Sequence, residues 1–238
     1  MTRTGAEGAG RNLTYTLLDA VGKAIVTGHY DHVAFPTEGD LARQYAVSRS
    51  VTREAVKMLT AKGLLAARPR KGTSIQPPRA WNLFDPDVLR WMLERKFSLD
   101  LLRQFTELRI AIEPVAAGLA AEAADAAGIA GIAAGYDRMV AAEAGNDDAL
   151  EADIAFHIAI LEASANPFYA QLSDVVSTAL RTSIRFTNRF KGRTASLPQH
   201  RAVLTAIEGR DADAARTAMA ALIADVMALI DDAERAGP

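Results

Sequence analysis

The pattern that most constrains this chain is the helical spacing of apolar residues from Trp81 onward, where we find no convincing strand. The spacing predicts about seven helical segments with short connections between them: 85–96, 99–124, 127–143, 149–164, 167–190, 197–209 and 211–234. Helices joined by short connections pack as antiparallel neighbours. The sequence therefore predicts a mostly α protein whose larger part is an antiparallel bundle of about seven helices.

A different pattern precedes the bundle. After a first helix in 13–28, the segment "FPTEGDLARQYAV" predicts a short helix with Thr37 as N-cap and Asp40 as its capping-box partner. A further helix, "SRSVTREAVKMLTAKG", would begin at the N-cap Ser48 and end at Gly63. Its expected buried stripe is Val51, Ala55, Met58 and Leu59, and its expected outer face is Arg49, Thr52, Arg53 and Lys57. Two short helices with a tight turn and a basic outer face predict a helix-turn-helix.

The next segment, "LLAARPRKGTSIQPP", predicts two short strands around a turn from Pro69 to Gly72. Such a hairpin would be a wing with a basic tip, directed at phosphates or at the minor groove. The prolines at 77 and 78 end it. We therefore predict a flexible tail in 1–10, a winged helix-turn-helix domain in 11–78 and a helical domain in 79–238.

Charge divides along the same boundary. Residues 1–80 carry 12 Lys and Arg against 6 Asp and Glu, whereas the remainder carries 15 against 23. This asymmetry predicts a basic domain that meets a polyanion. Cysteine is absent, which excludes disulfides and thiolate metal sites. No apolar run reaches the roughly 20 residues that span a bilayer, and the start does not read as a signal peptide. We expect a cytoplasmic protein with no membrane partner.

The basic row on the second helix of the pair has two interpretations. It could be only a solvated charged face. The alternative is contact with double-stranded DNA, which is favoured because the row lies on the second helix, has the hydroxyl residues Ser48, Ser50 and Thr52 beside it, and precedes a basic hairpin.

These stretches also carry a family resemblance. "SRSVTREAVKML" and "GLLAARPRKGTSI" resemble the winged helix-turn-helix of the GntR family of bacterial transcription regulators, and the helical remainder resembles its FadR, or FCD, branch. The resemblance implies a homodimer that binds operator DNA. It assigns phosphate and base contacts to Ser48, Arg49, Ser50 and Arg53, and the wing tip to Arg70, Lys71 and Gly72. Many relatives read a guanine with an arginine at the position of Gly39.

In the bundle, Asp153 and His157 lie four residues apart on one predicted helix, and His200 opens another. From spacing alone they could form hydrogen bonds or hold a metal ion. The FCD resemblance implies a divalent metal, zinc or similar, held by Asp153, His157 and His200. The family's fourth ligand position is occupied here by Leu222.

Arg109 also has two interpretations: a surface ion pair with Glu113, four residues on, or a planar fork for an effector carboxylate. The resemblance favours the second, and it makes 79–238 the effector-binding and dimerisation domain. Arg185, Asn188 and Arg189 in the segment 167–190 are weaker candidates for further polar contacts with the effector. It also implies a sugar acid as effector, namely an aldonate, ketoaldonate or uronate. Lactate, amino-acid-derived acids and acyl thioesters remain alternatives.

The function predicted from these features is a DNA-binding repressor released by a small carboxylate. An activator differs from it only in sign. The alternative of another class is a metal-dependent hydrolase or lyase that uses Asp153 and His157 and is tethered to a DNA-binding domain. No clear nucleophile elbow, P-loop or second carboxylate placed as a general base supports that alternative, so we predict that the chain is not an enzyme.

Overall fold

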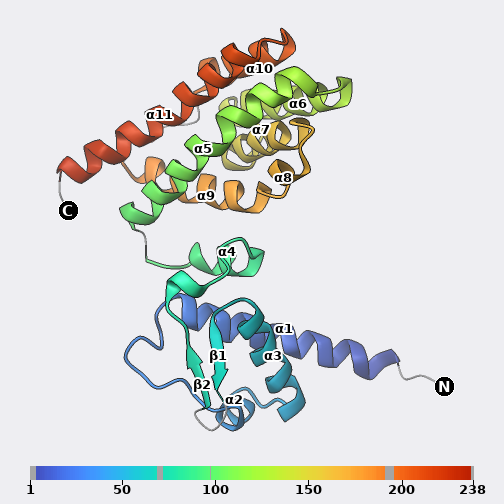
Figure 1. Ribbon diagram of the computed structural model, residues 1–238, viewed down its shortest axis with the longest axis vertical. Helices are drawn as coiled ribbons and strands as arrows, with labels where there is room; N and C mark the ends of the chain where they lie inside the picture. Colours follow the sequence, from blue (N-terminus) through green and yellow to red (C-terminus); the bar gives the residue numbers. More distant parts are fainter. Residues whose placement is uncertain (1–3, 69–71, 97, 191–195, 237–238) are drawn as a thin grey trace. The chain divides into compact units, whose positions relative to one another are not determined.

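The computed structural model of the protein describes residues 4–68, 72–96, 98–190 and 196–236 (Figure 1). The chain divides into two compact units, Met1–Lys96 and Phe97–Pro238. Within the described residues, both units are mostly helical and the sheet has two strands. The predicted mostly α class is confirmed.

The first unit consists of α1 (Thr4–Val26), α2 (Glu38–Gln44), α3 (Arg49–Ala61), β1 (Leu65–Arg68), β2 (Gly72–Ile75), a 3-10 turn (Pro78–Ala80) and α4 (Pro86–Met92). Helix α3 packs against both α1 and α2. Buried Leu17, Leu41 and Leu59 contribute one side chain from each of these helices to the core. Helix α1 begins at Thr4 and therefore includes residues 4–10, which were predicted to form a tail.

The two helix starts in the helix-turn-helix follow the predicted capping chemistry. The hydroxyl of Thr37 accepts the Asp40 N–H, and the Asp40 carboxylate accepts the Thr37 N–H at 3.1 Å. The hydroxyl of Ser48 accepts the N–H of Val51 at 3.3 Å. Between the helices, Ala46 takes a positive φ of 52°, which turns the chain sharply. The capping box and the second helix start are therefore confirmed.

Strands β1 and β2 form the predicted antiparallel hairpin, with Leu65 opposite Ile75 and Arg68 opposite Gly72. Gly72 has a φ of +79°, a conformation that residues with a Cβ rarely adopt. Residues 69–71, which form the predicted wing tip with Gly72, lie outside the described residues.

Helix α4 packs in the first unit, although its residues were predicted to belong to the second domain. The Trp91 ring is completely buried, and its Nε1–H donates to Asp19 of α1 at 2.8 Å. It fills the space beside Gly22, where a Cβ would lie 2.2 Å from the ring. Lys62, after α3, also lies 2.8 Å from the carboxylates of Asp85 and Asp87. The first compact unit therefore extends past residue 78 to Lys96.

The second unit consists of α5 (Leu99–Ala123), α6 (Ala126–Glu143), α7 (Ala149–Ala163), α8 (Pro167–Ala170), α9 (Ser173–Phe190), α10 (Leu197–Glu208) and α11 (Ala212–Ala236). The single helix predicted over 167–190 is two helices, because the chain turns at Gln171 and Leu172. Apart from this division, and from the helix predicted over 85–96 that belongs to the first unit, the predicted helical bundle is confirmed.

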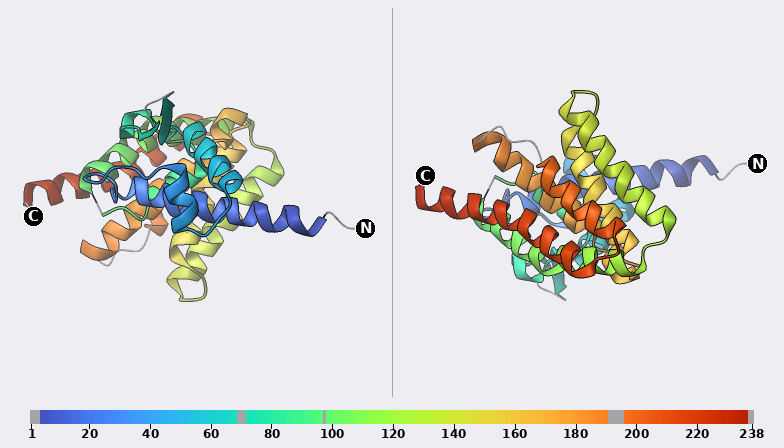
Figure 2. Two further views of the ribbon diagram at one scale, coloured as in Figure 1. Left: turned by 90° about the horizontal axis from the view of Figure 1, so that it is seen from below. Right: turned by 90° about the horizontal axis from the view of Figure 1, so that it is seen from above.

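Helix pairs define the packing of this unit. Helix α11 lies along α5, and α6 lies along α7 (Figure 2). The α6 and α7 backbones approach closely, since a Cβ at Gly135 would lie 2.8 Å from the Cα of Phe156. Helix α7 also contacts α5 and α9, while α10 contacts α5, α6 and α11. The central position of α7 places the side chains of Asp153 and His157 in the interior. No helix among the described residues is long and apolar enough to span a bilayer.

Candidate functional site

The outer face of α3 carries most of the residues predicted to contact DNA. Ser48, Arg49 and Ser50 are exposed, and the side chain of Arg53 is 68% exposed. The Nε of Arg53 lies 3.8 Å from a carboxylate oxygen of Glu38, an exposed pair that contributes little stability. A polyanion can therefore replace Glu38 as the partner of Arg53 with little loss of stability.

Thr52 does not belong to this face, and its predicted outer position is wrong. It is completely buried, and its hydroxyl donates to the carbonyl of Ser48 at 3.2 Å. The reason is the helical period: the residues at i+3, i+4 and i+7 from Thr52 are the buried Ala55, Val56 and Leu59. A contact between the Thr52 side chain and DNA is therefore excluded in this conformation.

The predicted wing contacts can be placed only in part. Arg70 and Lys71 lie outside the described residues. Gly72 is exposed at the start of β2, with open space where a Cβ would be. The hairpin that would present these residues is therefore present, while their own positions stay a prediction.

The three predicted metal ligands come together inside the second unit. Asp153 and His157 are on α7 and His200 is on α10, and these residues are 5%, 1% and 2% exposed. One carboxylate oxygen and one ring nitrogen from each histidine lie within 4.8 Å of one another. Asp153 Oδ1 is 3.1 Å from His200 Nε2 and 3.9 Å from His157 Nε2.

Hydrogen bonds on the far side of each imidazole determine which nitrogen can bind a cation. His200 Nδ1–H donates to the backbone carbonyl of Ser196 at 2.8 Å, and His157 Nδ1–H donates to the carboxylate of Glu113. A proton on Nδ1 leaves a lone pair on Nε2 in a neutral ring. Neither Nε2 atom has a hydrogen-bond partner in the described structure, although both are buried.

The donor set fits a divalent metal ion. The two buried Nε2 atoms lie close to one carboxylate oxygen of Asp153, and unpartnered buried polar atoms are rare without a ligand. Zinc is commonly held by three such protein ligands, with the fourth position left for water or a small ligand. The geometry therefore supports a metal site with an open position.

Arg109 forms the ion pair with Glu113 that spacing allowed, but the pair is buried rather than on the surface. The two side chains are 3% and 1% exposed, and Arg109 Nε lies 2.5 Å from Glu113 Oε1. The other carboxylate oxygen of Glu113 accepts the His157 bond. Glu113 thus connects the predicted effector residue to a predicted metal ligand. Sequence reasoning considered Glu113 only as a surface partner.

Buried charges lower the pKa values of both acids. Burial alone would raise the pKa of Glu113, but the charges of Arg109 and His157 and their hydrogen bonds lower it to about 2. Burial likewise opposes ionisation of Asp153, whereas the close approach of His200 Nε2, the charges that His157 and His200 carry when protonated, and the charge of Arg109 lower its pKa. Both carboxylates are therefore anionic near neutral pH.

The remaining predicted effector residues are less well placed. Arg185, Asn188 and Arg189 belong to α9, but their side chains lie outside the described residues. Leu222 is a buried residue of α11 and cannot act as a ligand. Among the described residues, the candidate metal ligands are therefore Asp153, His157 and His200.

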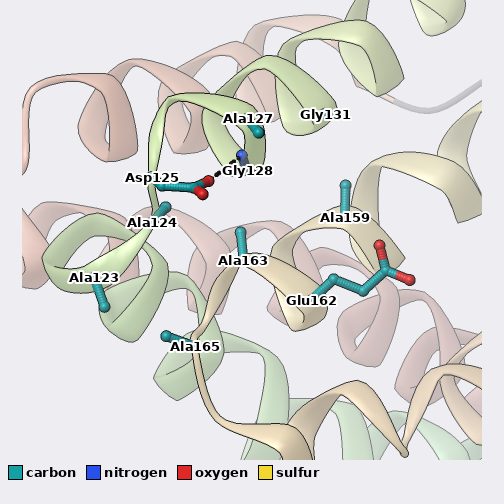
Figure 3. Close-up of a pocket in the computed structure, with 10 residues that line it drawn as sticks. All are labelled: Ala123, Ala124, Asp125, Ala127, Gly128, Gly131, Ala159, Glu162, Ala163 and Ala165. Atoms are coloured by element: carbon teal, nitrogen blue, oxygen red, sulfur yellow. Dashed lines mark hydrogen bonds between the residues drawn. The ribbon is translucent and has the colours of Figure 1, made fainter.

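A separate pocket lies where α5 ends, α6 begins and α7 ends (Figure 3). Its volume is about 360 Å³, and its walls are six alanines and two glycines with the carboxylates of Asp125 and Glu162. The Asp125 carboxylate accepts the Gly128 N–H at 2.7 Å. The pocket shares no residue with the cluster of Asp153, His157 and His200, and its two acids make it a poor site for an anion.

A winged helix-turn-helix followed in the same chain by a helical unit with a buried Asp–His–His cluster is the architecture of a DNA-binding transcription regulator. Comparison with known families agrees. Residues 15–75 match the "Bacterial regulatory proteins, gntR family" and residues 104–225 match the FCD domain. The chain belongs to the GntR family of bacterial regulators, in the branch that carries an FCD domain.

Individual relatives agree with this assignment. The chain is 34% identical over 218 residues to the galactonate operon transcriptional repressor of Escherichia coli K12, which covers 90% of this chain and 94% of that protein. It is 32% identical over 198 residues to the putative L-lactate dehydrogenase operon regulatory protein of the same strain, covering 78% and 73%. These relatives and families are regulators, so the alternative of a tethered enzyme is not supported.

Solved structures share the fold at low sequence identity. Lar, described as controlling the agr system of Listeria monocytogenes, has a TM-score of 0.58 at 18% identity, covering 92% of this chain and 96% of that one. E. coli McbR/YncC has a TM-score of 0.51 at 16% identity, covering 92% and 97%.

Proposed function

We propose that this regulator is a homodimeric repressor that leaves its operator when a sugar acid binds the helical unit. The observation that carries the proposal is the pair of buried, unpartnered Nε2 atoms of His157 and His200 beside the carboxylate of Asp153. A divalent ion bound there would supply a positive charge with an open coordination position. The regulator class itself follows from the family.

On the DNA side, Ser48, Arg49, Ser50 and Arg53 would contact phosphates and base edges, and the wing residues Arg70, Lys71 and Gly72 would contact the backbone or the minor groove. The exposure of the α3 residues supports this assignment. A homodimer would present two such heads to two half-sites of double-stranded operator DNA. The helical domain would hold the copies together.

On the effector side, the carboxylate would face the metal position and the guanidinium of Arg109. Arg185, Asn188 and Arg189 of α9 would contact the hydroxyl groups of the acid. The 34% identity to a galactonate operon repressor supports an aldonate, ketoaldonate or uronate. Release from DNA requires that the acid bind the DNA-incompetent arrangement more tightly than the competent one.

The decisive experiment is a gel-shift titration of the full chain on DNA from its own promoter region. A panel of aldonates, ketoaldonates and uronates is added with zinc present, and again after chelation. We expect one acid to release the DNA only when metal is present. His157→Gln should keep operator binding and lose the response. DNA binding that ignores every acid would contradict the sensor proposal.

L-Lactate is the second candidate, because a relative at 32% identity is named as an L-lactate dehydrogenase operon regulator. It has a carboxylate and an adjacent hydroxyl, the same two groups that a sugar acid offers to a metal. Including L-lactate in the panel decides between them, since the favoured acid should act at the lower concentration.

A further inference from the structure

Arg109, Glu113 and His157 form one continuous buried chain of contacts. Glu113 uses both carboxylate oxygens: Oε1 lies 2.5 Å from Arg109 Nε, and Oε2 accepts from His157 Nδ1 while lying 3.4 Å from Arg109 Nη2. All three side chains are at most 3% exposed. Water therefore does not screen these contacts, and a change at one end is felt at the other.

We propose that Glu113 couples carboxylate binding at Arg109 to metal binding at His157. The proposal rests on the proposed metal and effector site, and it assigns to Glu113 a positioning role rather than a direct contact with either ligand. Without the acceptor at Nδ1, the His157 ring would be free to move its proton to Nε2 and lose the lone pair needed by a metal. Hydrogen-bonding partners of this kind are a recurrent support for metal-binding histidines.

Arg109 limits how strongly Glu113 acts on His157. Its guanidinium draws on the same carboxylate that holds the imidazole, so the negative charge is shared between two partners. An effector carboxylate that engages Arg109 would compete with Glu113 for the guanidinium. Glu113 would then act more fully on His157, and the metal would be held more tightly. By reciprocity, bound metal would favour the carboxylate by the same factor.

A double-mutant cycle with zinc as the only probe tests this coupling. The zinc dissociation constant is measured by competition with a chromophoric chelator for the wild type, Glu113→Gln, Arg109→Gln and the double variant. We expect Glu113→Gln to weaken zinc binding by about 10–100-fold. Arg109→Gln should tighten zinc binding in the wild-type background. In the Glu113→Gln background, the same substitution should tighten zinc binding by a factor at least about fivefold smaller.

The matched control is Glu151→Gln. Glu151 is on α7 like His157 and also pairs with an arginine, Arg181, at 2.5 and 3.0 Å, but the pair is partly exposed and no hydrogen bond joins it to the histidines in the described structure. Glu151→Gln removes the same charge as Glu113→Gln, and its zinc affinity should stay within about twofold of the wild-type value. An equal loss in this control would overturn the proposal, because net charge alone would explain both.

A second readout does not depend on metal. Imidazole ¹⁵N spectra of the chelated protein should show His157 protonated on Nδ1 in the wild type, with an increased Nε2–H population in Glu113→Gln. Melting of the chelated variants identifies any loss of fold. Zinc affinity and tautomer unchanged by Glu113→Gln would overturn the coupling while leaving the metal site intact. A wild type without measurable zinc affinity would overturn the metal site as well.

Discussion

The arginines of α3 and of α5 show how burial changes the role of one residue type. The side chain of Arg53 is 68% exposed, and its Nε lies 3.8 Å from the carboxylate of Glu38. The side chain of Arg109 is 3% exposed, and its Nε lies 2.5 Å from the carboxylate of Glu113. Water screens the first pair, so it stabilises the fold little and leaves the cation available to DNA. The second pair is unscreened, so removing either partner leaves a buried charge uncompensated.

The same contrast separates the two sites. The face of α3 that is predicted to contact DNA consists of exposed groups whose positions follow from helix geometry. In the buried cluster, His157 donates a hydrogen bond to Glu113 and His200 donates one to the carbonyl of Ser196, and these bonds fix the orientation of both rings in advance. Mutations should therefore affect DNA affinity without affecting stability in the first site, and should affect both stability and ligand binding in the second.

The largest expected effect follows from breaking the buried pair. Arg109→Gln should lower the free energy of unfolding of the chelated protein by about 3–5 kcal/mol, because Glu113 would keep its charge without its main partner. Arg53→Gln, in the exposed pair, should change it by no more than about 0.5 kcal/mol. Urea denaturation followed by circular dichroism measures both. If both substitutions changed the free energy of unfolding by similarly small amounts, the contrast between the two regions would be wrong.

Acid should reveal the same buried pair. The pKa of Glu113 lies at about 2 in the folded protein, against an ordinary value of 4.5. Because the folded pKa is the lower one, the contribution is complete above pH 4.5 and is lost as the pH falls toward 2. It amounts to on the order of 3 kcal/mol. Urea unfolding of the chelated protein across this range should show a shallower acid slope for Glu113→Gln than for the wild type.

On the exposed face, Arg49→Ala should reduce operator affinity while leaving stability within about 0.5 kcal/mol of the wild type. An arginine that reads a guanine contributes about 1–3 kcal/mol of discrimination, so affinity for operator DNA should fall more than affinity for unrelated DNA. Gel-shift titration on both sequences measures the ratio. An unchanged operator affinity would remove Arg49 from the DNA-binding set.

The smallest effect separates two neighbours on α3. Thr52→Val removes a buried hydrogen bond to Ser48 and should lower stability by about 1 kcal/mol, with operator affinity unchanged once the fraction folded is taken into account. Ser50→Ala should lower operator affinity and leave stability unchanged, since Ser50 is exposed. A loss of operator affinity in folded Thr52→Val would restore Thr52 to the contact face.

Much of the fold could be predicted from local chemistry. The capping box of Thr37 and Asp40, the cap at Ser48 and the helical bundle follow from patterns within a few residues, and the structure confirms them. The assignment of α4 could not be predicted in this way. It depends on the Trp91 ring filling the space beside Gly22, a contact between residues far apart in the chain.

The candidate site divides along the same line. The i, i+4 spacing brought Asp153 and His157 to one helix face, and family resemblance added His200 and Arg109. The face of Thr52 was misjudged because Thr52 shares its helix face with the buried Ala55 and Val56 rather than with the exposed Arg53. Arg185, Asn188 and Arg189 stay predictions, as do Arg70 and Lys71.

The sequence by itself determined the starts of α2 and α3, the helix-turn-helix with its hairpin, and the placing of Asp153 and His157 on one helix face, because these depend on backbone geometry over one or two turns. Only the tertiary structure decided that Arg109 and Glu113 are buried, that Glu113 reaches His157 on another helix, and that the Nε2 atoms of both histidines lack partners. Burial and partnership depend on which helices pack together, and helical spacing specifies only which face of each helix turns inward.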